Sequence, residues 1–209
     1  MMSAGGRGGR RPDRPDFSAA VLAGGKGRRL GTDKTYIHIG GKPVLESISE
    51  NLLTIFPSVL LVVKSRNFPY VDPGPGVSVV SDVIPGKGPL GGIYTALEYS
   101  TAPYVFVMAC DMPYPSLDLI EGMLDEVKGR EAVVPRRGDY IEPLFAVYAR
   151  STREKIRPRL EEDRLKIQDF IDELDVRYLD EDEIATCDPC FRSFFNINTP
   201  EDLRRAPHV

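Results

Sequence analysis

Several residue types are scarce in this chain, and each scarcity excludes a class of protein. It has no tryptophan, two histidines and three cysteines in 209 residues. A disulfide scaffold needs more cysteines, so we expect a cytoplasmic protein. No apolar run reaches the roughly 18 residues of a membrane span, so no membrane is expected as a partner. A net charge of −4 and a pI near 5.3 give no global basic face, so no nucleic acid is expected either.

The few residues that bind transition metals do not predict a metal centre. Cys187 and Cys190 form a lone C-x-x-C, and a zinc site needs two more ligands. The histidines, His38 and His208, are far from this pair in the sequence. We therefore predict neither zinc binding nor a redox role for the pair, and we expect His38 at the surface or in packing.

The remaining composition is that of one globular domain. Charged residues make up 28% of the chain and apolar residues 42%. Residues 1–16 contain glycine, arginine and proline without an apolar core, which does not fit a secretory signal. We expect residues 1–16 to be a disordered extension and residues 17–209 to be the domain.

Short apolar runs alternate with amphipathic segments, which indicates an α/β fold. We expect strands at 19–23, 59–63, 77–80, 104–108, 132–134 and 144–148. We expect helices from Pro43 to Ile55 and at 90–99, 115–127, 151–162 and 166–174, with the acidic run 180–183 as a solvated turn. Because the strands are apolar on both faces, the prediction is a single-domain, doubly wound, mainly parallel sheet with helices on both faces. Ligands then bind at the carboxyl ends of the strands.

The most informative segment follows the first strand, at residues 24–34. It holds four glycines and four cations, which are Gly24, Gly25, Gly27, Gly31, Lys26, Arg28, Arg29 and Lys34. Glycines let the backbone turn tightly and expose N–H groups to an anion. The cations add positive charge at the same place, so a polyphosphate is the simplest ligand. A glycine-rich surface loop with solvated charges is the alternative.

Two known phosphate motifs do not fit this loop. No window between Gly24 and Lys34 matches G-x-x-x-x-G-K-[ST], the P-loop pattern. In the dinucleotide pattern G-x-G-x-x-G, Leu30 takes the place of the last glycine. The next strand also ends at Lys64, where a dinucleotide site needs an acid for the ribose.

Two carboxylates follow predicted strands. Asp111 comes after strand 104–108 and is well placed to hold Mg²⁺, although it could instead cap the helix that begins near Pro115. Asp82 follows strand 77–80 and precedes a glycine-rich turn, where it could contact a ligand or bond its own backbone. Lys87 in that turn is expected in solvent, with a phosphate contact as the alternative.

Two weaker motifs come later in the chain. Residues 140–148 enter a strand from an arginine-bearing turn. In residues 195–203, Asn196 and Asn198 are expected to share one face of a short strand, with Thr199 as the cap of a following helix. These asparagines could bind a ligand near Asp111 or could serve only the turn and the cap.

These motifs together resemble the molybdenum cofactor guanylyltransferase family over nearly all of residues 17–205. Residues 22–34 match L-A-G-G-x-x-x-R-[ML]-G-x-D-K, and residues 110–113 match C-D-x-P. Residues 88–92 match G-P-L-[AG]-G, and residues 196–203 match N-[VI]-N-T-P-E-[DE]-L. The resemblance implies a Rossmann-like nucleotidyltransferase fold. It also implies transfer of GMP from GTP to molybdenum-bound molybdopterin, with Mg²⁺ as cofactor and handover of the product to molybdoenzymes or other cofactor-biosynthesis proteins.

The resemblance also implies roles for individual residues. The catalytic residues would be Arg29, Lys34 and Asp111, with Asp111 as the metal ligand. The nucleotide would contact Leu22, Ala23, Gly24, Gly25, Lys34, Lys64, Asp82 and Asp111. The acceptor would contact Gly91, Glu142, Asn196 and Asn198.

One position departs from the family pattern. The family often has an asparagine shortly after the second strand, where this chain has Lys64, with Asn67 three residues later. The choice between GTP and CTP therefore stays open. A cytidylyltransferase or a sugar-phosphate nucleotidyltransferase is the first alternative, and a non-catalytic nucleotide-binding protein is the second.

The loop interpretation makes a prediction for Lys34. Lys34→Ala should lower kcat/KM at least ~10²-fold, because a phosphate clamp acts on charge that develops in the transition state. Steady-state kinetics of nucleotidyl transfer measures this loss. Turnover close to that of the parent protein would remove Lys34 from the mechanism.

Overall fold

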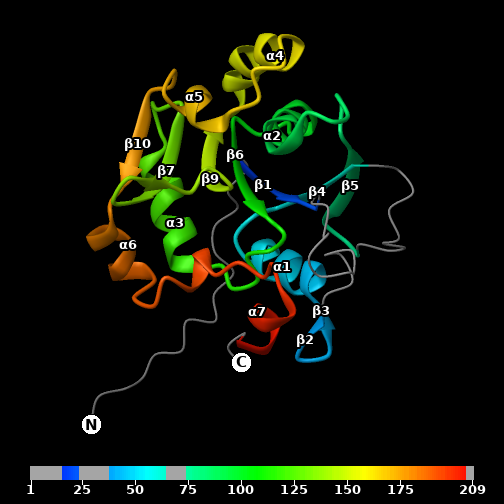
Figure 1. Ribbon diagram of the computed structural model, residues 1–209, viewed down its shortest axis with the longest axis vertical. Helices are drawn as coiled ribbons and strands as arrows, with labels where there is room; N and C mark the ends of the chain where they lie inside the picture. The colour runs from blue at the N-terminus through cyan, green and yellow to red at the C-terminus, as the bar shows by residue number, and fades with distance from the viewer. Residues whose placement is uncertain (1–15, 24–37, 65–73, 206–209) are drawn as a thin grey trace.

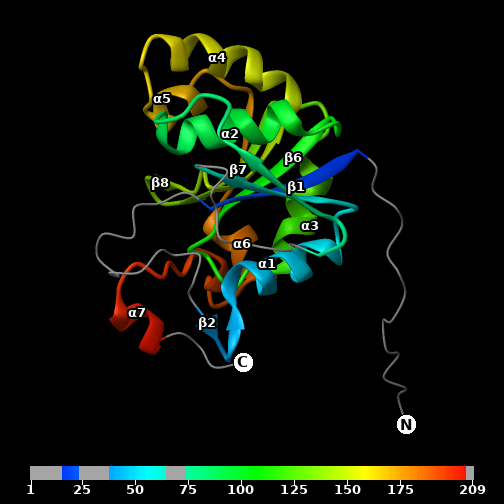
Figure 2. The ribbon, with the colours of Figure 1, turned by 90° about the vertical axis from the view of Figure 1, so that its right-hand side faces the viewer.

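The computed structural model describes residues 16–23, 38–64 and 74–205. In these ranges an eight-stranded sheet forms the middle layer, with helices on both faces (Figures 1 and 2). The strands of this sheet are β1 (Phe17–Leu22), β4 (Val59–Val63), β5 (Val77–Ser81), β6 (Tyr104–Ala109), β7 (Ala132–Arg137), β8 (Tyr140–Ile141), β9 (Phe145–Ala149) and β10 (Val176–Leu179). A separate pair consists of β2 (His38–Ile39) and β3 (Lys42–Pro43).

Seven helices are interspersed among the strands of the described residues. They are α1 (Val44–Leu53), α2 (Gly88–Tyr99), α3 (Leu117–Glu126), α4 (Arg153–Glu161), α5 (Ile167–Ile171), α6 (Glu181–Cys187) and α7 (Pro200–Arg205). The 3₁₀ turns η2 (Arg150–Thr152) and η3 (Arg192–Phe194) join them. In the ranges that the structure describes, no helix has the length and apolar character needed to cross a membrane.

The sheet is parallel except at two strands. Its order is β10-β7-β9-β6-β1-β4-β5, and β8 pairs with the end of β7. β9 runs antiparallel to both β6 and β7, and β8 runs antiparallel to β7. The chain moves from β1 outward through β4 to β5 and then returns to β6 on the other side of β1. The strand order therefore reverses between β1 and β6, which is the usual ligand position in such sheets.

Each face of the sheet has its own apolar core. Figure 2 shows α2, α4 and α5 on one face and α1, α3 and α6 on the other. Phe106 of β6 stacks on Phe56 and meets the edge of Phe145 on the second face. Val105 and Val107 of the same strand point into the first core. Side chains that alternate between two buried cores explain why the strands are apolar throughout.

The predicted α/β architecture is confirmed, including the mainly parallel sheet and the helices on both faces. The six predicted strands and five predicted helices are present, with ends that differ by a few residues. His38 is exposed at the edge of the small β2–β3 pair. The backbone pairing reaches Asp16, whose carbonyl accepts a hydrogen bond from Tyr104 N–H (3.1 Å).

The predicted turn at residues 180–183 is wrong, although these residues are exposed as expected. Residues 181–187 form α6, and Asp180 and Glu183 form a capping box at its start. The carboxylate of Glu183 accepts the N–H of Asp180 at 3.0 Å. Acidic side chains in the first turn favour a helix N-terminus, so the negative run starts a helix instead of preventing one.

Two glycines within helices give opposite expectations for the same substitution. A Cβ on Gly122 of α3 would meet open space, so Gly122→Ala should raise the free energy of unfolding by about 0.5–1 kcal/mol. A Cβ on Gly91 of α2 would lie 2.8 Å from Lys87 Cβ, so Gly91→Ala should lower it by about 1 kcal/mol or more. Urea denaturation measures both changes, and an equal stabilisation in the two variants would contradict the tight packing at Gly91.

Candidate functional site

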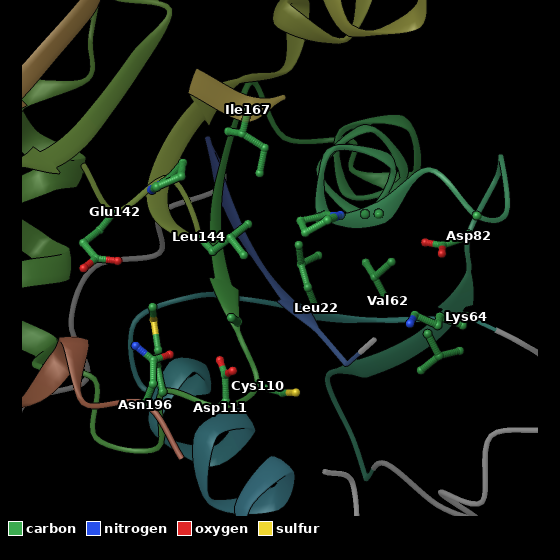
Figure 3. Close-up of a pocket in the computed structure, with 18 of the residues that line it drawn as sticks. Leu22, Val62, Lys64, Asp82, Cys110, Asp111, Glu142, Leu144, Ile167 and Asn196 are labelled. Atoms are coloured by element: carbon green, nitrogen blue, oxygen red, sulfur yellow. The ribbon is translucent and has the colours of Figure 1, made fainter. Parts of the chain in front are cut away.

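A cavity of about 840 Å³ opens at the carboxyl edge of the sheet (Figure 3). Its walls come from the ends of β1, β4, β5 and β6, the turn before α2 and the segment before β9. Because β9 runs antiparallel, its first residues meet the carboxyl ends of its neighbours. The cavity therefore lies where the strand order predicts a ligand.

Asp111 lies at the base of this cavity. The N–H of the preceding residue, Cys110, donates to Leu22 O at 3.3 Å, which fixes the end of β6 against β1. The backbone carbonyl of Asp111 accepts the N–H of Ile197 at 2.8 Å. The carboxylate itself points into the cavity (Figure 3).

The cap of the next helix is a different residue. Leu119 N–H donates to Ser116 Oγ at 3.3 Å, and this side chain is the N-cap of α3. The alternative in which Asp111 caps this helix is therefore wrong.

Glu142 and Asn196 lie on one side of Asp111 (Figure 3). Burial raises the pKa of Glu142; Arg137 opposes the shift, and the negative charge of Asp111 adds to it. The two carboxyl groups therefore repel each other across the cavity that both line. A cation bound in this part of the cavity would reduce their repulsion.

Asp82 and Lys64 lie on the opposite side of the cavity (Figure 3). Burial raises the pKa of Asp82, and the positive charge of Lys64 opposes the shift. In the turn after Asp82, the N–H of Val83 donates to Thr95 Oγ1 at 3.0 Å. Thr95 therefore anchors the turn, and the Asp82 carboxylate faces the cavity near Lys64 (Figure 3).

The donor set fits magnesium and not a closed zinc site. Among the described residues, no three histidine, cysteine, aspartate or glutamate side chains gather into a metal-binding group. Mg²⁺ is usually held by one or two carboxylates, with water and phosphate oxygens as its other ligands. Asp111, with Glu142 near it, supplies such a set. Cys187 and Cys190 carry free thiols.

The structure brings six of the predicted site residues together around the cavity, which are Leu22, Lys64, Asp82, Asp111, Glu142 and Asn196. Ala23 and Gly91 are buried beside it and are not among its lining residues. Gly24, Gly25, Arg29 and Lys34 lie outside the described residues, as does Asn67.

The second asparagine lies outside the cavity wall. Residues 196–198 form no strand, so the predicted strand is wrong there. Ile197 is buried, whereas Asn198 is exposed and its N–H donates to Asp202 Oδ2 at 3.0 Å. The predicted cap is confirmed, because Thr199 Oγ1 accepts the N–H of Asp202 at 3.1 Å. The hydrogen bonds at the N-terminus of α7 therefore fix the backbone conformation of Asn198 and Thr199.

Some lining residues were not predicted from the sequence. Gly86 and Gly88 line the cavity with positive φ angles of 83° and 62°, and their position in a Pro-Gly-rich turn was the available signal. Ile167 reaches the cavity from α5, for which the sequence has no local signal. Lys87 was expected in solvent, but its side chain is only 19% exposed and pairs with Asp163.

Comparisons with known proteins agree with this geometry. The family model for the MobA-like NTP transferase domain matches residues 19–177. A molybdenum cofactor guanylyltransferase of Syntrophotalea carbinolica is 36% identical over 194 residues, which cover 90% of this chain and 89% of the relative. A relative from Thermococcus kodakarensis is 39% identical over 193 residues, with 89% and 92% covered.

A solved structure supports the same relationship. Molybdopterin-guanine dinucleotide biosynthesis protein A from Archaeoglobus fulgidus superposes with a TM-score of 0.77 at 30% identity. The superposition covers 90% of this chain and 96% of that chain. With a matched family model and relatives along nearly its whole length, the chain belongs to the MobA-like NTP transferases, in the molybdenum cofactor guanylyltransferase family.

Proposed function

We propose that this protein transfers GMP from GTP to the terminal phosphate of molybdenum-bound molybdopterin. The observation that carries this proposal is the cavity in which the Asp111 carboxylate lies between two separate polar groups. Lys64 and Asp82 form one group, and Glu142 and Asn196 form the other. A volume of about 840 Å³ leaves room for two substrates side by side.

The reaction is an in-line displacement at phosphorus. An oxygen of the acceptor phosphate forms a bond to the α-phosphorus, while the bond from that phosphorus to the oxygen of the leaving pyrophosphate breaks. No covalent enzyme intermediate is required. Positioning of the two substrates and neutralisation of charge supply most of the catalysis in such transfers.

One side of the cavity serves the nucleotide. The Asp82 carboxylate accepts hydrogen bonds from the nucleoside, and its partly buried position keeps water from competing for them. Lys64 lies close to Asp82 and supplies positive charge beside the phosphates. By family resemblance, the backbone from Leu22 to Gly25 cradles the nucleotide, and Arg29 and Lys34 neutralise phosphate charge.

The other side serves the acceptor. Glu142 and Asn196 lie on the side of Asp111 opposite to Asp82 and Lys64, where the acceptor phosphate would approach the nucleotide. Asp111 is the residue that would hold Mg²⁺, and Glu142 lines the same cavity. When bound, Mg²⁺ neutralises charge on the phosphate groups during transfer. Gly91 and Asn198 do not line the cavity, so they affect acceptor binding indirectly. Gly91 acts through the backbone of α2, and Asn198 acts through the cap of α7.

A cytidylyl transfer is the second candidate, because Lys64 departs from the family pattern at a position that contacts the nucleotide in the family. This lysine takes the place of a family asparagine and lines the nucleotide side of the cavity. The low cysteine content fits a cytoplasmic setting for either reaction. In that setting the finished cofactor would pass to molybdoenzymes or to other cofactor-biosynthesis proteins.

Nucleotide selectivity tests the proposal. A ligand that binds only the folded state raises the melting temperature according to its concentration relative to Kd. In a thermal-shift titration with GTP, CTP, ATP and UTP, GTP should give the largest shift, and Mg²⁺ should increase it. A larger shift with CTP would move the protein to the cytidylyltransferases. No shift with any nucleotide, also when acceptor is present, would count against the proposed function.

Asp111 gives the sharpest single-residue test of metal use. Asp111→Asn keeps the shape of the side chain and removes its charge, so kcat/KM should fall at least ~10²-fold. The increase in nucleotide binding caused by Mg²⁺ should also disappear. Asp118→Asn is the matched control, because Asp118 is exposed on α3 and does not line the cavity. Equal activity in the two variants would remove Asp111 from the metal site.

A further inference from the structure

Asp163 has an unusual backbone conformation at the end of α4. Its φ of 55° lies in the left-handed region, which L-residues other than glycine, asparagine and aspartate rarely adopt. Asp163 N–H donates to Leu160 O at 3.4 Å, and Arg164 N–H donates to Arg159 O at 2.8 Å. These two bonds form a Schellman motif with Asp163 at the position that glycine normally takes. A charged residue therefore occupies a site where glycine would be more stable.

The side chain of Asp163 has a specific partner. Its Oδ1 lies 2.5 Å from Lys87 Nζ, although the two residues are 76 positions apart in the sequence. The Lys87 side chain is 19% exposed, whereas that of Asp163 is 76% exposed. A Cβ at Gly91 would clash with Lys87 Cβ, so the absent side chain of Gly91 leaves room for the lysine stem. This packing directs the ammonium group toward the end of α4.

The lysine lies between two residues of the cavity wall and is not itself a lining residue. Gly86 and Gly88, on either side of Lys87, both line the cavity and both have positive φ angles. This turn begins soon after Asp82 and leads directly into α2. Glycines allow such a turn many conformations, so a contact that fixes Lys87 also restricts the backbone on the nucleotide side of the cavity.

We propose that the Lys87–Asp163 ion pair is a latch that positions the Gly86–Gly88 turn for nucleotide binding. The proposal rests on the proposed function, because it takes this side of the cavity as the nucleotide site. Lys87 and Asp163 are positioning residues here and do not contact the reacting atoms. The strained conformation of Asp163 is retained because glycine at this position could not hold Lys87.

Two substitutions separate positioning from stability. In Asp163→Asn the new residue still tolerates the left-handed conformation, but the negative charge is lost. In Asp163→Gly the backbone strain is removed and the negative charge is lost as well. The melting temperature of Asp163→Gly should be equal to or higher than that of the parent protein. The melting temperature of Asp163→Asn should be equal to or lower than that of the parent. Both variants should nevertheless raise the Kd for GTP with Mg²⁺ about three- to fivefold, the size expected for a partly exposed ion pair. Calorimetric titration of the full chain measures this Kd.

A neighbouring ion pair provides the matched control. Glu162 and Arg164 pair at 2.7 Å at the same helix end and do not line the cavity. Glu162→Gln should therefore leave the Kd for GTP unchanged. The double variant Lys87→Glu with Asp163→Lys should bring the Kd back to within about twofold of the parent, because the reversed charges can pair again.

The outcomes separate this inference from the proposed function. A higher Kd in both Asp163 variants, with recovery on charge reversal, supports the latch. An unchanged Kd, or a Kd that changes only in the variant with the lower melting temperature, overturns the latch and leaves the proposed function intact. If the parent protein binds neither GTP nor CTP, both the latch and the proposed function are wrong.

Discussion

The pairing of β1 with β6 is the constraint on which the site depends. These two strands are neighbours in space, but β4 and β5 lie between them in the sequence. At this reversal of strand order, the carboxyl ends of β1 and β6 lie at the same edge of the sheet. Leu22 and Asp111 therefore reach the same cavity, and the hydrogen bond from Cys110 N–H to Leu22 O fixes their separation.

Among the described residues, the charged ones that line this cavity are one lysine and three carboxylates, Lys64, Asp82, Asp111 and Glu142. Burial raises the pKa values of Asp82 and Glu142, which shows that both carboxyl groups are partly removed from water. The positive charge of Lys64 lowers the pKa of Asp82 and so offsets part of this shift. The pKa of Glu142 is raised further by the negative charge of Asp111 and lowered by the positive charge of Arg137. The charge of Asp82 is therefore offset by Lys64, whereas a bound cation would reduce the repulsion between Glu142 and Asp111.

The sequence predicted those parts of the structure that depend on local pattern. Apolar runs located the strands, and their ends located Asp82 and Asp111, because strand ends in a parallel sheet must meet at one edge. Contacts between distant segments were not predicted. The pairing of Asp163 with Lys87 and the approach of Ile167 to the cavity depend on how α4 and α5 pack over α2, which no local pattern encodes. The acidic start of α6 was missed because a capping box resembles a polar turn.

The measurement that tests the account most directly is the identity of the product. The purified protein is incubated with Mg²⁺, molybdenum-bound molybdopterin and equal concentrations of GTP and CTP, and the dinucleotide formed is identified by mass spectrometry. The account predicts the guanine dinucleotide of molybdopterin, with one pyrophosphate released for each product molecule. A cytosine dinucleotide, or no dinucleotide from a protein that binds GTP, would contradict it.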